Sequence, residues 1–229
     1  MIDKSPIILA LDVPDIDSAC TLIDATRNSI SIYKLGLEFY LAHGRTGITK
    51  VQECFPEIDI FLDLKLHDIP NTVAGAATSI VDLTPRFLTV HAAGGAAMVR
   101  AAVQALPATS ITAVTVLTSL DQSELTTLGL PADPQGFALL LARRALDAGA
   151  TSIVCSPHEA ALLRRELGSR VTIITPGVRP LGSDKGDQSR VMTPRDAISQ
   201  GADYVVIGRP ITQAPVPAEA AAEIRNSLL

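Results

Sequence analysis

The stretch Pro6-Ile7-Ile8-Leu9-Ala10-Leu11-Asp12 places five consecutive apolar residues in front of an acid. Near the other end of the chain, Tyr204-Val205-Val206-Ile207 is a run of the same kind and leads into Gly208-Arg209. Continuous apolar runs of this length are typical of strands that are buried on both faces in a parallel sheet. These two segments therefore predict a fold built around a covered parallel sheet.

The same pattern recurs between these two segments, with each apolar run followed by an Ala- and Leu-rich amphipathic stretch. The predicted strands are 6–12, 31–36, 59–66, 87–92, 111–118, 152–157, 171–177 and 204–209. Apolar residues at three- and four-residue spacing predict helices over 17–25, 73–81, 95–106, 136–148, 158–167 and 217–229. Eight strands alternating with helices predict an α/β fold, a (β/α)8 TIM barrel that forms a single catalytic domain over residues 1–229.

A doubly wound open sheet is the alternative to the barrel. Such a sheet usually carries a G-x-G-x-x-G turn after its first strand. Here the first strand leads into Asp12-Val13-Pro14-Asp15, which has no glycine. The barrel is therefore favoured.

Composition restricts the class of protein. Hydrophobic residues make up 47% and charged residues 19% of the 229 residues, which is an ordinary globular mixture. No apolar run approaches the ~18 residues of a membrane span, and no signal-peptide pattern follows the first run. The three cysteines are far apart, so we expect no disulfide framework and a cytoplasmic location. The net charge of −5, with scattered basic residues, indicates no nucleic-acid partner.

Polar side chains close several of the predicted strands. In a (β/α)8 barrel the active site lies at the carboxyl ends of the strands, so these residues are candidates for function. An acid in such a position more often caps a turn or helix, and a lysine is usually solvated. So many charged groups at one rim of an apolar barrel are harder to explain by structure alone. The candidates are Asp12, Lys34, Asp63, Lys65, Thr118 and Arg209; His91 ends the fourth strand, but a structural role explains it at least as well and it is not counted among the site residues.

The third strand carries the most specific of these patterns, D-x-K-x-x-D, in Asp63-Leu64-Lys65-Leu66-His67-Asp68. Because side chains alternate along a strand, Asp63 and Lys65 share one face. A structural ion pair and a helix-capping Asp68 are the plain alternatives. However, a buried ion pair gains little over apolar residues. The array fits proton handling better, with the carboxylates holding an ammonium that delivers a proton.

Two glycine- and arginine-containing turns predict a phosphate site. Strand seven ends in Gly177-Val178-Arg179, and strand eight ends in Gly208-Arg209. The loops after these two strands form the usual phosphate site of such barrels. Glycine lets backbone N–H groups approach an anion, and arginine supplies a fork of donors. The polar segment 181–194, which contains Gln188, is interpreted either as a lid or as a surface excursion.

Several segments together resemble the orotidine 5′-phosphate decarboxylase family. They are Leu9-Ala10-Leu11-Asp12, Lys34-Leu35-Gly36, Asp63-Leu64-Lys65-Leu66-His67-Asp68-Ile69-Pro70-Asn71-Thr72, Leu117-Thr118-Ser119, Pro176-Gly177-Val178-Arg179-Pro180, Asp187-Gln188 and Ile207-Gly208-Arg209-Pro210. The resemblance runs from the first strand to the last, and no motif position departs from the pattern.

The resemblance implies decarboxylation of orotidine 5′-phosphate to UMP and CO2, without metal or cofactor, as the last step of pyrimidine synthesis. It implies a homodimer in which Lys65 protonates C6 beside Asp63, while Asp68 reaches in from the neighbouring subunit. It also implies substrate contacts. These would be made by Asp12, Lys34, Asp63, Thr72, Thr118, Arg179, Gln188, Gly208 and Arg209.

Two other functions stay open at this stage. Sugar-phosphate enzymes resembling 3-keto-gulonate phosphate decarboxylase and hexulose phosphate synthase share D-x-K-x-x-D but use magnesium, and they typically carry Glu where this chain has Lys34. A catalytically silent phosphometabolite-binding protein is the second, since a fold does not determine function. Lys34 disfavours the first, and the intact set of Asp63, Lys65 and Asp68 disfavours the second.

Overall fold

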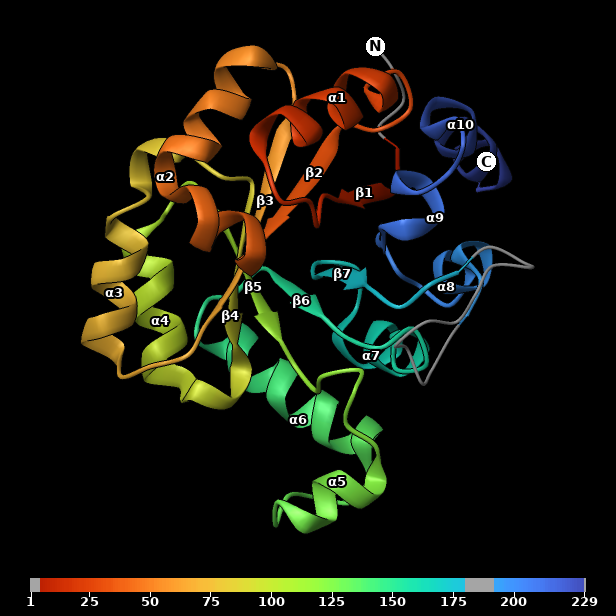
Figure 1. The fold of residues 1–229 in the computed structure, drawn as a ribbon. Coiled ribbons are helices and arrows are strands. Elements are labelled where there is room, and N and C mark those ends of the chain that lie inside the picture. The colour runs from red at the N-terminus through yellow and green to blue at the C-terminus, as the bar shows by residue number, and fades with distance from the viewer. Residues whose placement is uncertain (1–4, 180–191, 229) are drawn as a thin grey trace.

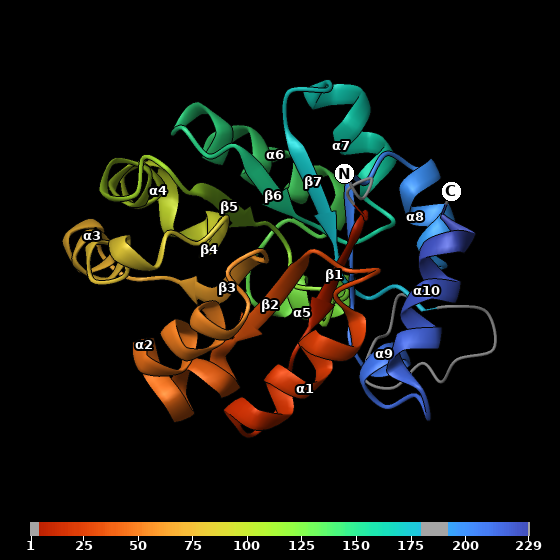
Figure 2. The same cartoon turned by 90° about the horizontal axis from the view of Figure 1, so that it is seen from above.

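Eight parallel strands close into a barrel in the computed structural model of the chain, which describes residues 5–179 and 192–228. Each strand pairs with its sequence neighbours, and β1 closes the ring on β8 through the register Ile8↔Val206. Figure 2 shows this ring of strands enclosed by helices. The strands are β1 (Ile7–Ala10), β2 (Ile32–Gly36), β3 (Asp59–Leu66), β4 (Phe87–His91), β5 (Ser110–Val114), β6 (Ser152–Val154), β7 (Thr172–Thr175) and β8 (Tyr204–Ile207). The predicted barrel is confirmed.

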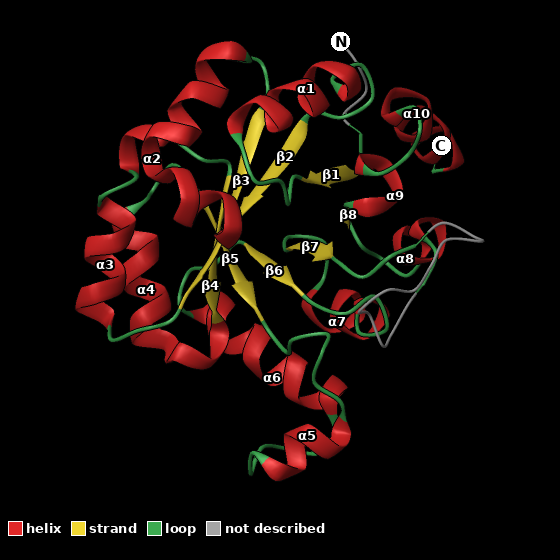
Figure 3. Ribbon diagram, in the orientation of Figure 1, coloured by secondary structure: helices red, strands yellow, loops and turns green. Residues whose placement is uncertain are grey.

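Helices alternate with the strands and form the outer layer (Figure 3). They are α1 (Ile16–Thr26), α2 (Leu37–Cys54), α3 (Pro70–Thr78), α4 (Gly95–Ala105), α5 (Gln122–Thr127), α6 (Pro134–Asp147), α7 (Ala160–Leu167), α8 (Pro194–Ser199), α9 (Arg209–Thr212) and α10 (Pro217–Ser227), with short 3-10 turns η1 (Val81–Leu83) and η2 (Ala92–Gly94). The apolar periodicity did not predict α2, α5, α8 or α9. In α2 the pattern is interrupted at Gly44, where a positive φ of 57° joins two helical halves.

Both faces of the strands are apolar because each face meets a different core. Alternate residues such as Ile8, Ile32 and Phe61 fill the barrel interior, and all three are buried. The residues between them pack against the surrounding helices in a second, larger cluster. Two buried faces explain why the strands are continuous apolar runs rather than alternating ones.

Several predicted strands end earlier in the structure. β1 ends at Ala10, β5 at Val114 and β8 at Ile207, so Asp12, Thr118 and Arg209 lie in the segments that follow rather than on the strands. These segments still belong to the carboxyl end of the barrel, where function is expected.

The third strand is irregular at this end. Its pairing with β4 follows the register Leu62↔Leu88 and then shifts to Leu66↔Val90. Within the shifted segment Lys65 has a φ of 47°, a left-handed conformation that non-glycine residues seldom adopt. The irregularity falls on the D-x-K motif itself.

One further helix, α5, belongs to the segment between β5 and β6. Helix α5 lies beside α6 at the bottom of Figure 1, and its Leu125 packs in one cluster with Val116 and with Ala138 of α6. Among the residues that the structure describes, no helix is long and apolar enough to cross a membrane.

Candidate active site

A carboxylate between two ammonium groups forms the centre of the site. Asp63 Oδ1 lies 2.8 Å from Lys65 Nζ, and Asp63 Oδ2 lies 3.5 Å from Lys34 Nζ. The Asp63 and Lys34 side chains are only 13% and 11% exposed. Lys34 Nζ also contacts Asp12 Oδ1 at 3.0 Å, and the Asp12 side chain is 60% exposed. The four charges therefore run from the interior of the barrel to its rim.

The strand register brings these side chains together. Lys34 on β2 pairs with Ala10 of β1, and Asp63 on β3 pairs with Gly36 of β2. Side chains that point inward from neighbouring parallel strands meet at the barrel mouth. Lys34 and Asp63, which are 29 positions apart in the sequence, therefore become direct neighbours.

Gly36 gives Lys34 the room it needs. A Cβ at position 36 would lie 3.0 Å from Lys34 Nζ and 3.6 Å from Asp12 Oδ1. Such a contact is closer than ordinary van der Waals packing allows, so a side chain here would push the ammonium away. The glycine of K-x-G is therefore explained by the approach of the lysine two residues before it.

The two ammonium groups hold Asp63 in its charged form. Burial raises the pKa of a carboxyl group, but the charges of Lys34 and Lys65, with hydrogen bonds from Lys65 and Thr89, leave the pKa of Asp63 below its ordinary value of 3.8. Asp63 is consequently an anion at neutral pH. It anchors both lysines and cannot donate a proton itself.

Two adjoining cavities open beside this cluster. The first, of about 190 Å³, has Asp63, Lys65 and Thr118 in its wall, together with the apolar side chains of Phe61, Val114, Val116, Leu117, Val154 and Val206. The second, of about 210 Å³, is lined by Asp12, Gly177, Arg179, Gly208 and Arg209, among others. Lys34, Pro176 and Val206 line both cavities. The site thus has an apolar chamber beside Lys65 and a polar chamber with two arginines.

Most of the residues expected at the site line these cavities. Asp12, Lys34, Asp63, Lys65, Thr118, Arg179, Gly208 and Arg209 do so. Gln188, and all of the segment 181–194 except its last three residues, lie outside the described residues.

Asp68 and Thr72 are placed differently. Both are exposed, and neither lines the two cavities. Asp68 accepts a hydrogen bond from the N–H of Ile69 at 2.6 Å, whereas α3 begins after Ile69 without a side-chain cap. No ion pair joins Asp68 to Lys65 in the part of the chain that the structure describes. Helix capping therefore does not explain Asp68, whose exposed carboxylate lines neither of the two cavities.

Sequence reasoning missed Thr89, a buried residue of β4. Its hydroxyl contacts both the backbone of Lys65 and the carboxylate of Asp63. A threonine inside an apolar strand gives no signal of its own, because buried hydroxyls are common in strands.

His91 lies at the edge of the site. Burial, the adjacent His67 and the Lys65 ammonium lower the pKa of His91 below its ordinary value of 6.5. Its ring lies 5.3 Å from that of His67, centroid to centroid. The lowered pKa favours the neutral form of the His91 ring at pH 7.

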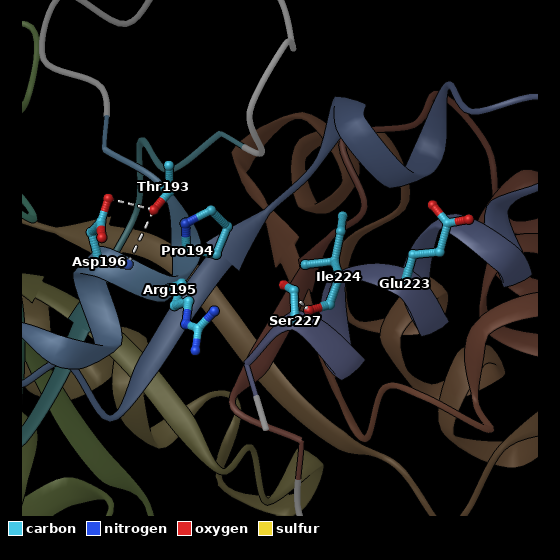
Figure 4. Close-up of a pocket in the computed structure, with 7 residues that line it drawn as sticks. All are labelled: Thr193, Pro194, Arg195, Asp196, Glu223, Ile224 and Ser227. Carbon is cyan, nitrogen blue, oxygen red and sulfur yellow. Dashed lines mark hydrogen bonds between the residues drawn. The ribbon is translucent and has the colours of Figure 1, made fainter.

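A larger cavity, of about 470 Å³, lies elsewhere, between the start of α8 and the end of α10 (Figure 4). Its residues include Thr193 and Asp196, whose polar atoms bond to each other, with Thr193 Oγ1 2.6 Å from Asp196 Oδ2. It contains none of the charged cluster around Asp63, so its size alone does not make it the active site.

Within residues 5–179 and 192–228, no three His, Cys, Asp or Glu side chains gather into a group that could hold a metal ion. Asp12 and Asp63, the carboxylates that line the two cavities, both contact Lys34.

Comparisons with known proteins match the whole barrel. The model of the family described as "Orotidine 5'-phosphate decarboxylase / HUMPS family" matches residues 5–224. An orotidine 5'-phosphate decarboxylase of Thermobifida fusca is 54% identical over 224 residues, which cover 98% of this chain and 96% of that protein. One of Frankia casuarinae is 46% identical, with 98% of this chain and 88% of that protein covered. The crystal structure of orotidine 5'-phosphate decarboxylase from Lactobacillus acidophilus has a TM-score of 0.85 at 32% identity and covers 98% of this chain and 99% of that one.

The charge balance at Asp63 predicts a pH-dependent effect on stability. Asp63→Asn leaves two ammonium groups facing a neutral amide, so it should lower the free energy of unfolding at pH 7 by about 3 kcal/mol. Because the folded-state pKa is lowered, the carboxylate stabilises the fold at any pH above 3.8, and this contribution is lost only as the pH falls through the lowered value. Urea unfolding from pH 8 to pH 3 measures the difference between variant and wild type.

The control is Asp24→Asn, which removes one side of an exposed ion pair with Arg27. That change should stay within about 0.5 kcal/mol at every pH. An Asp63→Asn difference as small as the control's, or one that disappears already at pH 6, would contradict the charge balance described here.

Proposed function

The chain belongs to the orotidine 5′-phosphate decarboxylase / HUMPS family, and we propose that Lys65, held by Asp63 at the barrel mouth, is the proton donor of its reaction. The protein decarboxylates orotidine 5′-phosphate to UMP and CO2, the last step of UMP biosynthesis. The observation that carries the proposed role of Lys65 is its 2.8 Å ion pair with the buried Asp63 in the wall of an apolar chamber.

The chemistry requires a cation beside C6. When the bond from C6 to the carboxylate breaks, CO2 leaves and the electron pair remains on C6. An ammonium fixed next to that carbon stabilises the developing charge, and a water-poor wall strengthens the interaction. At 4 Å and an effective dielectric of 20 the attraction is about 4 kcal/mol. Transfer of one ammonium proton to C6 then yields UMP and a neutral lysine, which takes a proton back from water.

Asp63 positions this proton donor. Its carboxylate binds Lys65 with Oδ1 and Lys34 with Oδ2, so neither ammonium is free to turn away from the chamber. Preorganised charges of this kind need little rearrangement when the reaction occurs.

The second cavity suits the phosphate and ribose of a nucleotide. Arg179 and Arg209 supply cationic side chains there, and Gly177 has a φ of 76° that only glycine adopts readily. Lys34 lines both chambers and Asp12 lines the polar one, and these two side chains fit the ribose hydroxyls. Thr118 lines the apolar chamber, where the pyrimidine would sit. Binding of the distant phosphate aligns the ring against Lys65 and so contributes to the rate. Gln188 belongs to the same proposed phosphate end.

Lys34 supports catalysis without a metal ion or cofactor. A magnesium-dependent relative would need free carboxylates at this mouth to hold the cation. Here the Lys34 ammonium lies 3.0 Å from Asp12 and 3.5 Å from Asp63 and forms an ion pair with each. Both carboxylates are therefore already paired with an ammonium, which argues against the magnesium-dependent sugar-phosphate alternative.

We further propose a homodimer in the cytoplasm, with each barrel forming one catalytic domain. Asp68 is exposed, lines neither cavity, and precedes Ile69, which is 66% exposed. A single exposed isoleucine is ordinary on a protein surface, so the proposal rests on Asp68, a carboxylate of the catalytic motif that lines neither cavity of its own chain. In this arrangement Asp68, with Thr72 one helical turn further, serves the site of the neighbouring subunit.

The proposed proton donor is tested by Lys65→Ala. Orotidine 5′-phosphate turnover, followed by its ultraviolet absorbance, should fall at least about a thousandfold, while the dissociation constant for UMP changes by less than about tenfold, because the lysine acts mainly on the transition state. Lys50→Ala, on the exposed side of α2, is the matched control and should retain full activity.

Wild-type protein treated with EDTA should keep its turnover. Activity that is lost with EDTA and restored by magnesium would favour the sugar-phosphate chemistry instead. Turnover by Lys65→Ala within tenfold of wild type would remove Lys65 from the donor role.

The shared site is tested by subunit mixing. Lys65→Ala and Asp68→Ala chains are each inactive when homodimeric. In a mixed two-fold dimer one pocket lacks both groups and the other has both. Random exchange makes half of the dimers mixed, so about a quarter of wild-type activity should return. No recovery, with exchange verified by mass-tagged subunits, would place Asp68 in its own subunit's site or outside the reaction.

A further inference from the structure

One buried hydroxyl joins the two charged residues of the reaction centre. Thr89 of β4 is fully buried. Its Oγ1 accepts a hydrogen bond from the backbone N–H of Lys65 at 2.8 Å and donates one to Asp63 Oδ1 at 3.0 Å. Asp63 Oδ1 is also the atom that binds the Lys65 ammonium. Backbone, carboxylate and ammonium thus form a closed loop through the threonine.

The backbone at Lys65 is strained. Its φ of 47° is in the left-handed region, which is unfavourable for a side chain that carries a Cβ. Such conformations persist only where the surrounding structure enforces them. A specific contact at this residue must therefore hold it.

The strand ladder does not provide that contact. Between the register pairs Leu62↔Leu88 and Leu66↔Val90, three residues of β3 stand opposite the single residue Thr89 of β4. The extra residues interrupt the regular backbone pairing, and the N–H of Lys65 is bonded to a side chain instead. A buried N–H left without any partner would be unfavourable.

We propose that Thr89 is a positioning residue that holds Lys65 in its left-handed conformation and thereby aims the ammonium into the substrate chamber. The hydroxyl takes the place of the missing ladder carbonyl as the acceptor for Lys65 N–H. Its proton is directed to Asp63, so the same atom also fixes the carboxylate that anchors the ammonium. A hydroxyl can accept and donate at once, which neither a methyl group nor a carbonyl can do.

The inference rests on the proposed role of Lys65 and extends it to a residue that touches no substrate. It predicts a loss in the chemical step rather than in binding. A misplacement of a reacting group by about 1 Å can reduce a rate about a hundredfold. The phosphate chamber, lined by Arg179 and Arg209, does not include Thr89 and should bind as before.

The test compares Thr89→Val, Thr89→Ser and the control Thr112→Val. Valine keeps the shape of threonine but neither accepts nor donates, whereas serine keeps the hydroxyl. Thr112 pairs with Thr89 in the register, is equally buried, and bonds to Ser152 at 2.6 Å, away from the charged cluster. A general effect of removing a buried strand hydroxyl should therefore appear in both valine variants.

We expect Thr89→Val to lower kcat about a hundredfold, with KM for orotidine 5′-phosphate within threefold of wild type. Thr89→Ser should recover kcat to within about fivefold of wild type, because serine keeps the hydroxyl. Thr112→Val should leave kcat within about twofold of wild type, since the hydroxyl that contacts Lys65 and Asp63 is that of Thr89 and not that of Thr112. Thermal unfolding confirms that each variant is folded. If Thr89→Val does not fold, Thr89→Ala replaces it with the same expectation.

A kcat for folded Thr89→Val or Thr89→Ala within threefold of wild type would overturn the inference. So would a rise in KM at unchanged kcat, or a serine variant as impaired as the valine one. If Lys65→Ala is inactive while Thr89→Val is fully active, only the positioning role of Thr89 fails. If Lys65→Ala itself is active, the proposed proton donor fails first.

Discussion

A buried carboxylate that must be neutralised from two sides is the constraint on which this site depends. Asp63 is almost fully enclosed at the barrel mouth, and an isolated anion there would be very unfavourable. Lys34 and Lys65 offset that burial, and each is held in turn by the carboxylate. Replacing the cluster with apolar residues would suit stability equally well or better. The proposed mechanism gives a reason for its presence, since a fixed ammonium would stabilise an electron pair developing at C6.

The barrel brings these charged side chains together with little departure from regular strand geometry. Parallel register places Lys34 and Asp63 on neighbouring strands and leaves room for the lysine over Gly36. Only the end of β3 departs from ideal geometry, where the register shifts and Lys65 turns into the left-handed region. The hydroxyl of Thr89 bonds the strained residue at that point. Backbone strain thus falls on the residue that is proposed as the proton donor.

Much of this arrangement could be predicted from the sequence, for identifiable reasons. Strands that are apolar on both faces appear as continuous apolar runs, so their positions could be predicted. Polar residues late in these runs or directly after them identified Asp12, Lys34 and Asp63 as candidates for the site. Alternation along the strand predicted correctly that Asp63 and Lys65 meet, although the structure joins them through an irregular turn rather than a regular strand. Thr89 and the kinked α2 were not predictable, because a buried hydroxyl and a helix interrupted at Gly44 leave no periodic signal. The exposed position of Asp68 depends on the outward course of the chain after β3, which no local pattern encodes.

The central claim, that Lys65 is the acid that protonates C6, can be measured without decarboxylation. A group that delivers a proton to C6 must also be able to remove it, since the reverse step follows the same path. Incubation of UMP with the enzyme in D2O should therefore exchange hydrogen for deuterium at C6, seen by NMR as loss of the H6 signal. The account predicts exchange with the wild-type protein and none above background with Lys65→Ala. Equal exchange with both proteins would contradict it.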